Sequence, residues 1–104
     1  MSMINIVGTV CFPDKEERFN KWYKEVHIPL ILKTPGMLRA SRYKVIDTDD
    51  DQGKYLTMFE MEDMEAMKRW ENGPERKATH QNKLDTWGEA GFAVTWAGYF
   101  NRLK

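Results

Sequence analysis

Large apolar side chains recur along the chain with two periods, one typical of strands and one typical of helices. Alternating positions and short apolar runs predict strands at residues 3–12, 37–47, 54–61 and 92–103. Helical spacing predicts helices at residues 15–29, 63–70 and 75–87. Asn72-Gly73-Pro74 separates the last two helices, which we count as one interrupted unit. The order of elements is therefore strand, helix, strand, strand, helix, strand.

The first predicted helix carries one continuous apolar stripe. Its members follow i, i+3, i+7 and i+11 and are Phe19, Trp22, Val26 and Leu30. Pro29 has no amide hydrogen and crowds the preceding turn, so we expect the helix to bend or restart near Ile28. This places His27 in the last regular turn, beside the stripe and one turn after Tyr23.

Polar residues mark the starts of the helices and the connection between the middle strands. Asp14, with Glu17 three residues later, predicts the N-cap of the first helix, and Asp63 predicts that of the second. Residues 47–53, DTDDDQG, alternate acidic positions. A calcium loop needs a central Gly and a distant bidentate Glu, which are not in register here. We therefore expect a solvated hairpin connection.

Charged side chains interrupt two of the predicted strands. Regular alternation in the second strand places Arg39 and Arg42 on opposite faces. In the third strand, Glu60 falls on an otherwise apolar face. We expect Glu60 and Arg42 either to pair with each other or to reach solvent at a sheet edge.

The order of elements is that of an α+β, ferredoxin-like βαββαβ sandwich, with four antiparallel strands and the helices on one face. A chain of 104 residues fits one domain, residues 1–104. In a monomer the opposite face of the sheet would be polar. In the first, third and fourth strands, however, both faces carry apolar or aromatic groups. We therefore expect a homodimer that joins through the helix-free faces.

Composition narrows the classes of partner. Sixteen Lys and Arg balance sixteen Asp and Glu, so no net charge attracts nucleic acid or an anionic membrane. No apolar run approaches the ~20 residues of a membrane span. The amino terminus lacks the basic region and cleavage site of a signal peptide, so we expect a cytoplasmic protein. Cys11, His27 and His80 form no metal-ligand spacing; we expect Cys11 to be a small buried group and His80 to lie on the surface.

Large apolar side chains are numerous for so charged a chain, with four Trp, four Tyr, five Phe and seven Met. A ligand cavity with aromatic walls would cover part of this surface, and a second copy of the chain would cover another part. The sequence leaves both arrangements open.

One stretch carries a resemblance to a known family. Residues 22–43, WYKEVHIPLILKTPGMLRASRY, join an aromatic pair, His-x-Pro, Pro-Gly and a strand with Arg-Tyr, and the late WAGYFNRL strand is compatible. The chain resembles the dimeric α/β-barrel superfamily and, within it, the EthD-like proteins. The resemblance implies that two ferredoxin-like protomers close a barrel, with a pocket between each sheet and its helices. Members include cofactor-independent monooxygenases, muconolactone-type isomerases, polyketide cyclases, haem-degrading enzymes and proteins without known activity.

The resemblance also implies roles for single residues. The histidine of this helix lies in the pocket of EthD-like relatives, so His27 is the candidate acid/base, and no cofactor is expected. The expected walls of a pocket for a small hydrophobic, ring-containing ligand are Trp22, Tyr23, Tyr43 and Trp96. Glu60 or Arg42 would orient a polar substituent of that ligand.

Two function classes remain open at this point. The first is a small cofactor-independent enzyme of isomerase, cyclase or monooxygenase type that uses His27. The second is a non-catalytic homodimeric barrel that binds a small hydrophobic ligand or has a stress or scaffold role. In that second case His27 would cap helix carbonyls that Pro29 leaves open, and the aromatic residues would belong to the core or the dimer interface.

Overall fold

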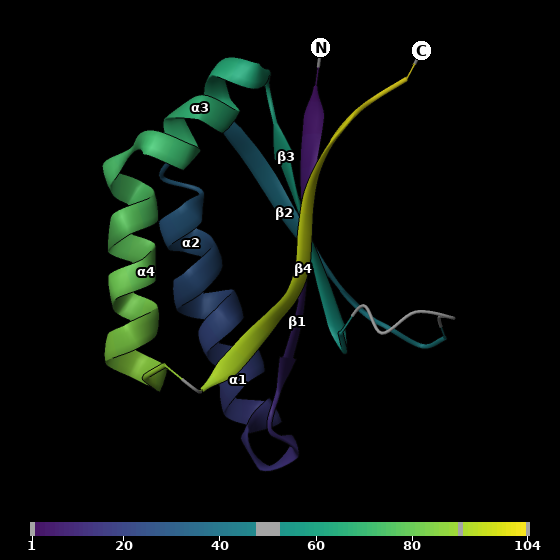
Figure 1. Ribbon diagram of the computed structural model, residues 1–104, viewed down its shortest axis with the longest axis vertical. Helices are drawn as coiled ribbons and strands as arrows, with labels where there is room; N and C mark the ends of the chain where they lie inside the picture. The colour runs from purple at the N-terminus through teal and green to yellow at the C-terminus, as the bar shows by residue number, and fades with distance from the viewer. Residues whose placement is uncertain (1, 48–52, 90, 104) are drawn as a thin grey trace.

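A four-stranded antiparallel sheet carries the helices on one face in the computed structural model, which describes residues 2–47, 53–89 and 91–103 (Figure 1). The strands are β1 (Met3–Cys11), β2 (Met37–Lys44), β3 (Tyr55–Met61) and β4 (Phe92–Asn101). Their order across the sheet is β2-β3-β1-β4, and every neighbouring pair is antiparallel. The predicted ferredoxin-like fold is confirmed.

The first helical segment changes its winding twice. A 3-10 turn (Pro13–Lys15) leads into α1 (Glu16–Trp22), a π turn (Tyr23–His27) and α2 (Ile28–Ile31). At the end of the π turn, the backbone N–H of Ile28 donates to the carbonyl of Tyr23, five residues back. Pro29 follows at once and has no N–H to continue the regular ladder. The predicted restart near Ile28 is therefore confirmed.

The predicted N-cap at Asp14 is wrong, whereas that at Asp63 is confirmed. Asp14 lies inside the 3-10 turn that Pro13 opens, and α1 begins without a side-chain cap. By contrast, the backbone N–H of Ala66 donates to Asp63 Oδ1 over 3.0 Å at the start of α3 (Met64–Asn72). Pro13 pre-forms the turn, and the N–H groups of Lys15 and Glu16 donate to the carbonyls of Phe12 and Pro13 and not to Asp14.

The second helical unit is α3 followed almost directly by α4 (Pro74–Trp87), whose first residue is a proline. Thr79 is buried in α4, and its hydroxyl donates to the Glu75 carbonyl over 2.7 Å. Ala78, on the same helix, is exposed. This helix has few large apolar residues, so Trp87 and Leu84, both half-buried, decide which side faces the protein. No described helix is long and apolar enough to cross a membrane.

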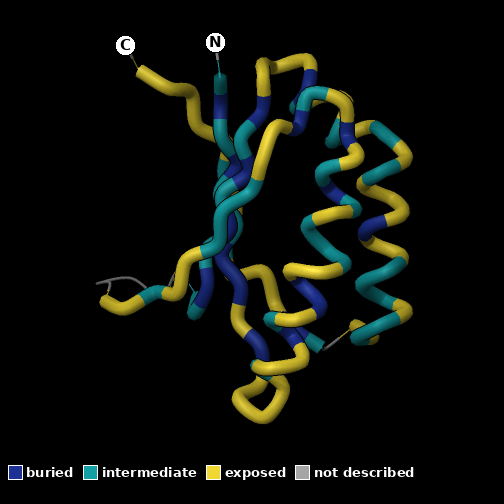
Figure 2. The backbone as a smooth tube through the Cα atoms, turned by 180° about the vertical axis from the view of Figure 1, so that it is seen from behind, coloured by how far each residue is buried: buried dark blue, intermediate teal, exposed yellow. Residues whose placement is uncertain are grey.

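Buried positions occur along both the helices and the sheet (Figure 2). The core that they form falls into two clusters. One consists of Met3, Ile31, Met37, Phe59, Met61 and Ala66. The other is mostly aromatic and consists of Cys11, Phe19, Trp22, Tyr23, Tyr55 and Phe92. Cys11 is buried and His80 is exposed, as expected.

A bulge between Met37 and Arg39 decides which side chains of β2 face the helices. The prediction of one regular alternation along this strand is wrong, because the bulge puts Met37 and Arg42 on the same side. Arg42 lies opposite Thr57 on the helix-covered face, and Tyr43 lies opposite Leu56 on the other face. The acidic connection predicted at residues 47–53 falls largely outside the described residues.

The helix-free face of the sheet is largely apolar. Strand register places on it Ile4, Ile6, Val10, Tyr43, Leu56, Met58, Trp96 and Phe100. Val10, Tyr43 and Phe100 are among the large side chains that this face leaves exposed. This is the face that the sequence expects to be covered by a second copy.

Candidate functional site

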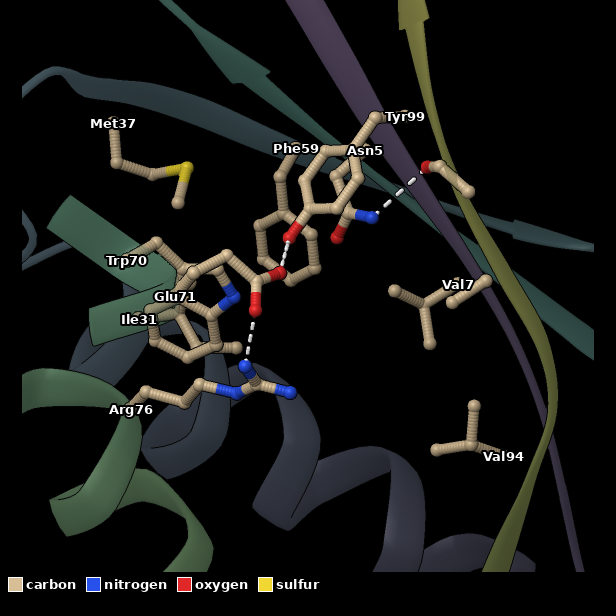
Figure 3. Close-up of a pocket in the computed structure, with 12 residues that line it drawn as sticks. Asn5, Val7, Ile31, Met37, Phe59, Trp70, Glu71, Arg76, Val94 and Tyr99 are labelled. Atoms are coloured by element: carbon tan, nitrogen blue, oxygen red, sulfur yellow. Dashed lines mark hydrogen bonds and ion pairs between the residues drawn. The ribbon is translucent and has the colours of Figure 1, made fainter. Parts of the chain in front are cut away.

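A cavity of about 300 Å³ lies between the sheet and the helices, beside the edge strand β4 (Figure 3). Most of its wall is apolar and consists of Val7, Ile31, Met37, Phe59, Trp70 and Val94. Four polar side chains complete it: Asn5, Glu71, Arg76 and Tyr99. An apolar chamber with a few converging polar groups is the usual form of a small-molecule site.

The polar groups of this cavity are connected to one another. The Tyr99 hydroxyl donates to one oxygen of the Glu71 carboxylate, and the Arg76 guanidinium pairs with the other (Figure 3). The Gly73-Pro74 turn between α3 and α4 brings Glu71 and Arg76 together. Burial and the hydrogen bond to Glu71 raise the pKa of Tyr99, so its hydroxyl stays neutral and remains a donor.

Asn5 is the fourth polar side chain of the cavity wall. Its side-chain nitrogen donates to the Gly98 carbonyl over 2.9 Å, which fixes the amide against β4. Its oxygen is turned away from Gly98 and toward the cavity (Figure 3). Asn5 is only 9% exposed, so this oxygen is a buried acceptor in the cavity wall.

His27 lies beside this cavity, in the aromatic cluster. Its ring stacks on Trp22 at 4.7 Å between centroids and contacts Tyr23 at 4.6 Å. The π turn makes this possible, because its wider winding brings residues five apart into line. One turn further along, Ile31 lines the cavity, whereas His27 is not among the residues that line it in the described chain.

The environment keeps the His27 imidazole neutral. Burial lowers its pKa to about 4, and the positive charges of Lys83 and Arg42 act in the same direction. Its Nδ1 is buried and has no hydrogen-bond partner within the described residues. No described hydrogen bond joins the ring to a helix carbonyl, so the structure provides no contact for a capping role.

Arg42 belongs to the same cluster. Its guanidinium lies over the Tyr23 ring at 4.2 Å and donates to Asn20 Oδ1 over 2.9 Å. Burial lowers the pKa of Arg42. The cation–π contact with Tyr23 offsets part of the hydration that the guanidinium loses on burial.

The structure separates the sequence-predicted site residues into two groups. His27, Trp22, Tyr23 and Arg42 lie together on the helix-covered face. Tyr43, Glu60 and Trp96 lie on the helix-free face. Glu60 does not pair with Arg42. It accepts two hydrogen bonds from Arg39, at 2.5 and 3.1 Å, because the bulge turns Arg39 to that face.

Sequence reasoning missed the polar end of the cavity. The one signal was Asn5, a polar residue between Ile4 and Ile6 in an otherwise apolar strand. Glu71 and Arg76 resemble the solvated charges around them, and only the α3–α4 turn brings them to the cavity. Within residues 2–47, 53–89 and 91–103, no three His, Cys, Asp or Glu side chains gather closely enough to hold a metal ion.

Residues 1–95 match a family described as a domain of unknown function, DUF4286. The chain belongs to the DUF4286 family. No curated protein matches this DUF4286 chain in sequence.

Solved structures show the fold that this DUF4286 protein shares. An EthD-family protein from Bacillus halodurans is 17% identical, with a TM-score of 0.65 over 92% of this chain and 96% of that one. SnoaB, a cofactor-independent oxygenase from Streptomyces nogalater, is 16% identical, with a TM-score of 0.60 over 99% and 92%. A dimeric ferredoxin-like protein of unknown function from Jannaschia is 12% identical, with a TM-score of 0.60 over 91% and 96%. The expected resemblance to EthD-like proteins is confirmed at the level of the fold.

Proposed function

We propose that this protein binds a small hydrophobic, ring-containing molecule in the cavity between its sheet and helices and transforms it without a cofactor. The reaction would be an isomerisation, a cyclisation or an oxygenation. The observation that carries the proposal is the cavity itself, in which an apolar chamber converges on Asn5, Tyr99, Glu71 and Arg76. The fold shared with SnoaB, a cofactor-independent oxygenase, supports the same class of activity.

His27 remains the candidate acid/base of this reaction. A neutral imidazole is ready to accept a proton, and its buried Nδ1 has no partner to compete for that role. A pKa of about 4 makes it a weak base toward a neutral substrate, because a general base works best with a pKa near the working pH. A substrate that develops negative charge beside His27 would raise this pKa and strengthen the base.

The second candidate is a binding protein without catalysis. Two observations favour it: the low pKa of His27 and its absence from the residues that line the cavity, since both reduce direct proton transfer to a bound molecule. In this case Trp22, Tyr23 and Arg42 would act as core residues outside the cavity wall.

We also propose that the protein works as a homodimer joined through its helix-free faces. The apolar side chains of that face, with Ile6 and Met58 at its centre, support this arrangement. The dimeric ferredoxin-like protein from Jannaschia has the same fold. Tyr43, Glu60 and Trp96 would then lie at the interface, and their role in substrate binding would depend on the partner copy.

A turnover screen tests the proposed activity. Phenols, quinones and lactones are incubated with the protein under air and under nitrogen, and the products are followed by mass spectrometry. Val7→Phe fills the chamber, and Ile46→Phe, at a side chain that is 96% exposed, is the matched control. We expect conversion by the wild type and by Ile46→Phe, and none by Val7→Phe.

His27→Phe separates the two candidate functions, because it keeps the ring stack but removes the nitrogen atoms. Loss of general acid–base catalysis lowers a rate by about 10²- to 10⁴-fold. A rate unchanged by His27→Phe would remove this residue from the mechanism. Binding of a compound without any conversion would establish the second candidate in place of the first.

A further inference from the structure

The polar end of the cavity offers free hydrogen-bond acceptors as well as donors. The Glu71 carboxylate has about four lone-pair positions and no hydrogen to give. Tyr99 occupies one position on one oxygen and Arg76 one on the other, so positions remain on both. The Asn5 oxygen adds another acceptor, and the Tyr99 hydrogen is already committed to Glu71. A ligand group that donates a hydrogen bond therefore finds free acceptors on Glu71 and Asn5, while the remaining N–H groups of Arg76 are donors at this end.

The apolar and polar ends lie at different depths. Phe59 and Ile31 are 3% and 4% exposed and form the deep wall. Tyr99 is 37% exposed and lies on the edge strand, so the polar end is the mouth. Of the two charged side chains, that of Glu71 is 35% exposed and that of Arg76 is 52% exposed. A ligand that enters with its apolar body first would place its polar substituent beside the carboxylate.

The size of the chamber limits the ligand. Pockets for small molecules usually measure about 300 to 1,000 Å³, and this one, at about 300 Å³, is at the lower end. One or two fused rings fill such a volume.

We propose that the cavity takes an uncharged molecule of one or two fused rings with a phenolic hydroxyl, which donates a hydrogen bond to the Glu71 carboxylate. This specificity rests on the proposed function, because it concerns the same cavity. A carboxylate in place of the hydroxyl has no hydrogen to donate to Glu71 and would have to use the remaining N–H groups of Arg76 instead. Glu71 is thus the residue that selects the ligand, and Tyr99 and Arg76 hold its carboxylate in position.

Three ligands with the same ring system test this selection: 1-naphthol, 1-methoxynaphthalene and 1-naphthoate. Binding is measured by calorimetry and by the fluorine NMR signal of 5-fluorotryptophan at Trp70, which lines the cavity. A hydrogen bond to a charged group corresponds to roughly 10- to 100-fold in affinity. We expect naphthol to bind at least tenfold more tightly than its methyl ether, and naphthoate to bind more weakly than naphthol.

Three variants assign the preference to one side chain. Glu71→Gln should bring naphthol close to the affinity of the ether and leave the ether unchanged. Glu65→Gln changes an exposed carboxylate on the same helix and should keep the preference. Arg76→Gln leaves the carboxylate but removes one of the groups that hold it, so it should reduce the preference less than Glu71→Gln does.

Three other results would overturn one or both proposals. Equal binding of naphthol and its ether, with the Trp70 signal shifted, would overturn the selection by Glu71 and leave the proposed function standing. Tightest binding of naphthoate, lost in Arg76→Gln, would overturn it in favour of an anion held by Arg76. An unmoved Trp70 signal with all three ligands would overturn both proposals.

Discussion

At the scale of the residue, His27 shows how a local distortion creates a chemical environment. The π turn lays its ring against Trp22 and Tyr23, and the charges of Lys83 and Arg42 oppose its protonation. The sequence indicated the contact with Tyr23, because four residues separate the two rings. The low pKa follows from the folded chain, which buries the imidazole and brings the charges of Lys83 and Arg42 to it from α4 and β2.

Protonation of His27 should make stability depend on pH. Its pKa is about 4 in the folded state and near 6.5 in an unfolded chain, so the unfolded state binds the proton more tightly. Stability should therefore be complete above pH 6.5 and fall as the pH decreases toward 4, by on the order of 3 kcal/mol from this group. Urea denaturation at several pH values measures it.

His27→Phe should flatten this pH dependence while keeping the ring stack. His80→Gln, at an exposed position on α4, is the control and should keep the wild-type slope. An equal slope in wild type and His27→Phe would show that His27 is not held neutral.

At the scale of the element, prolines and N-caps set the boundaries of the helices. Pro13, Pro29 and Pro74 each stand at the first or second residue of a helical segment, and the steric effect of a proline can be predicted from the sequence. N-caps formed by aspartate are harder to predict from the sequence. Asp14 and Asp63 have similar sequence surroundings, but only Asp63 bonds to an open backbone amide. The bulge at Leu38 was not predictable, because no glycine marks it.

The two aspartates provide a matched pair for an experiment. Asp63→Ala should lower the free energy of unfolding by about 1 kcal/mol, the usual effect of losing an N-cap. Asp14→Ala should leave it nearly unchanged, since its side chain caps no helix. Chemical denaturation of both variants checks this, and equal losses would contradict the assignment of the caps.

At the scale of the whole molecule, the order of elements was enough to predict the sheet and its helix-covered face. The resemblance implied a pocket between the sheet and its helices, but the polar groups of the cavity were not predictable, since they come from β1, β4, α3 and α4 and only the folded chain brings them together. The sequence predicted that the helix-free face would be apolar, because apolar groups occupy both faces of three strands. The placement of Tyr43 and Trp96 on it depends on the irregularities in the pairing of β2 and β4.

The helix-free face should join two copies of the chain. A stable interface usually buries about 800 Å² per partner, and the apolar side chains of this face would provide its centre. Ile6→Glu puts a charge in the middle of β1 and should convert a dimer into a monomer. Lys77→Glu, on the exposed side of α4, should remain dimeric. Light scattering gives the masses, and a monomeric wild type would refute the interface.

The occupied cavity is the central claim, and one measurement tests it most directly. The protein labelled with 5-fluorotryptophan has four reporters, of which Trp70 lines the cavity, Trp22 and Trp87 lie in or against the aromatic cluster, and Trp96 lies on the helix-free face. During a titration with 1-naphthol, we predict a saturable shift of the Trp70 signal that Val7→Phe abolishes, with Trp96 unmoved. A saturable shift at Trp96 with Trp70 unmoved would contradict the account, because it would place the ligand on the opposite face of the sheet.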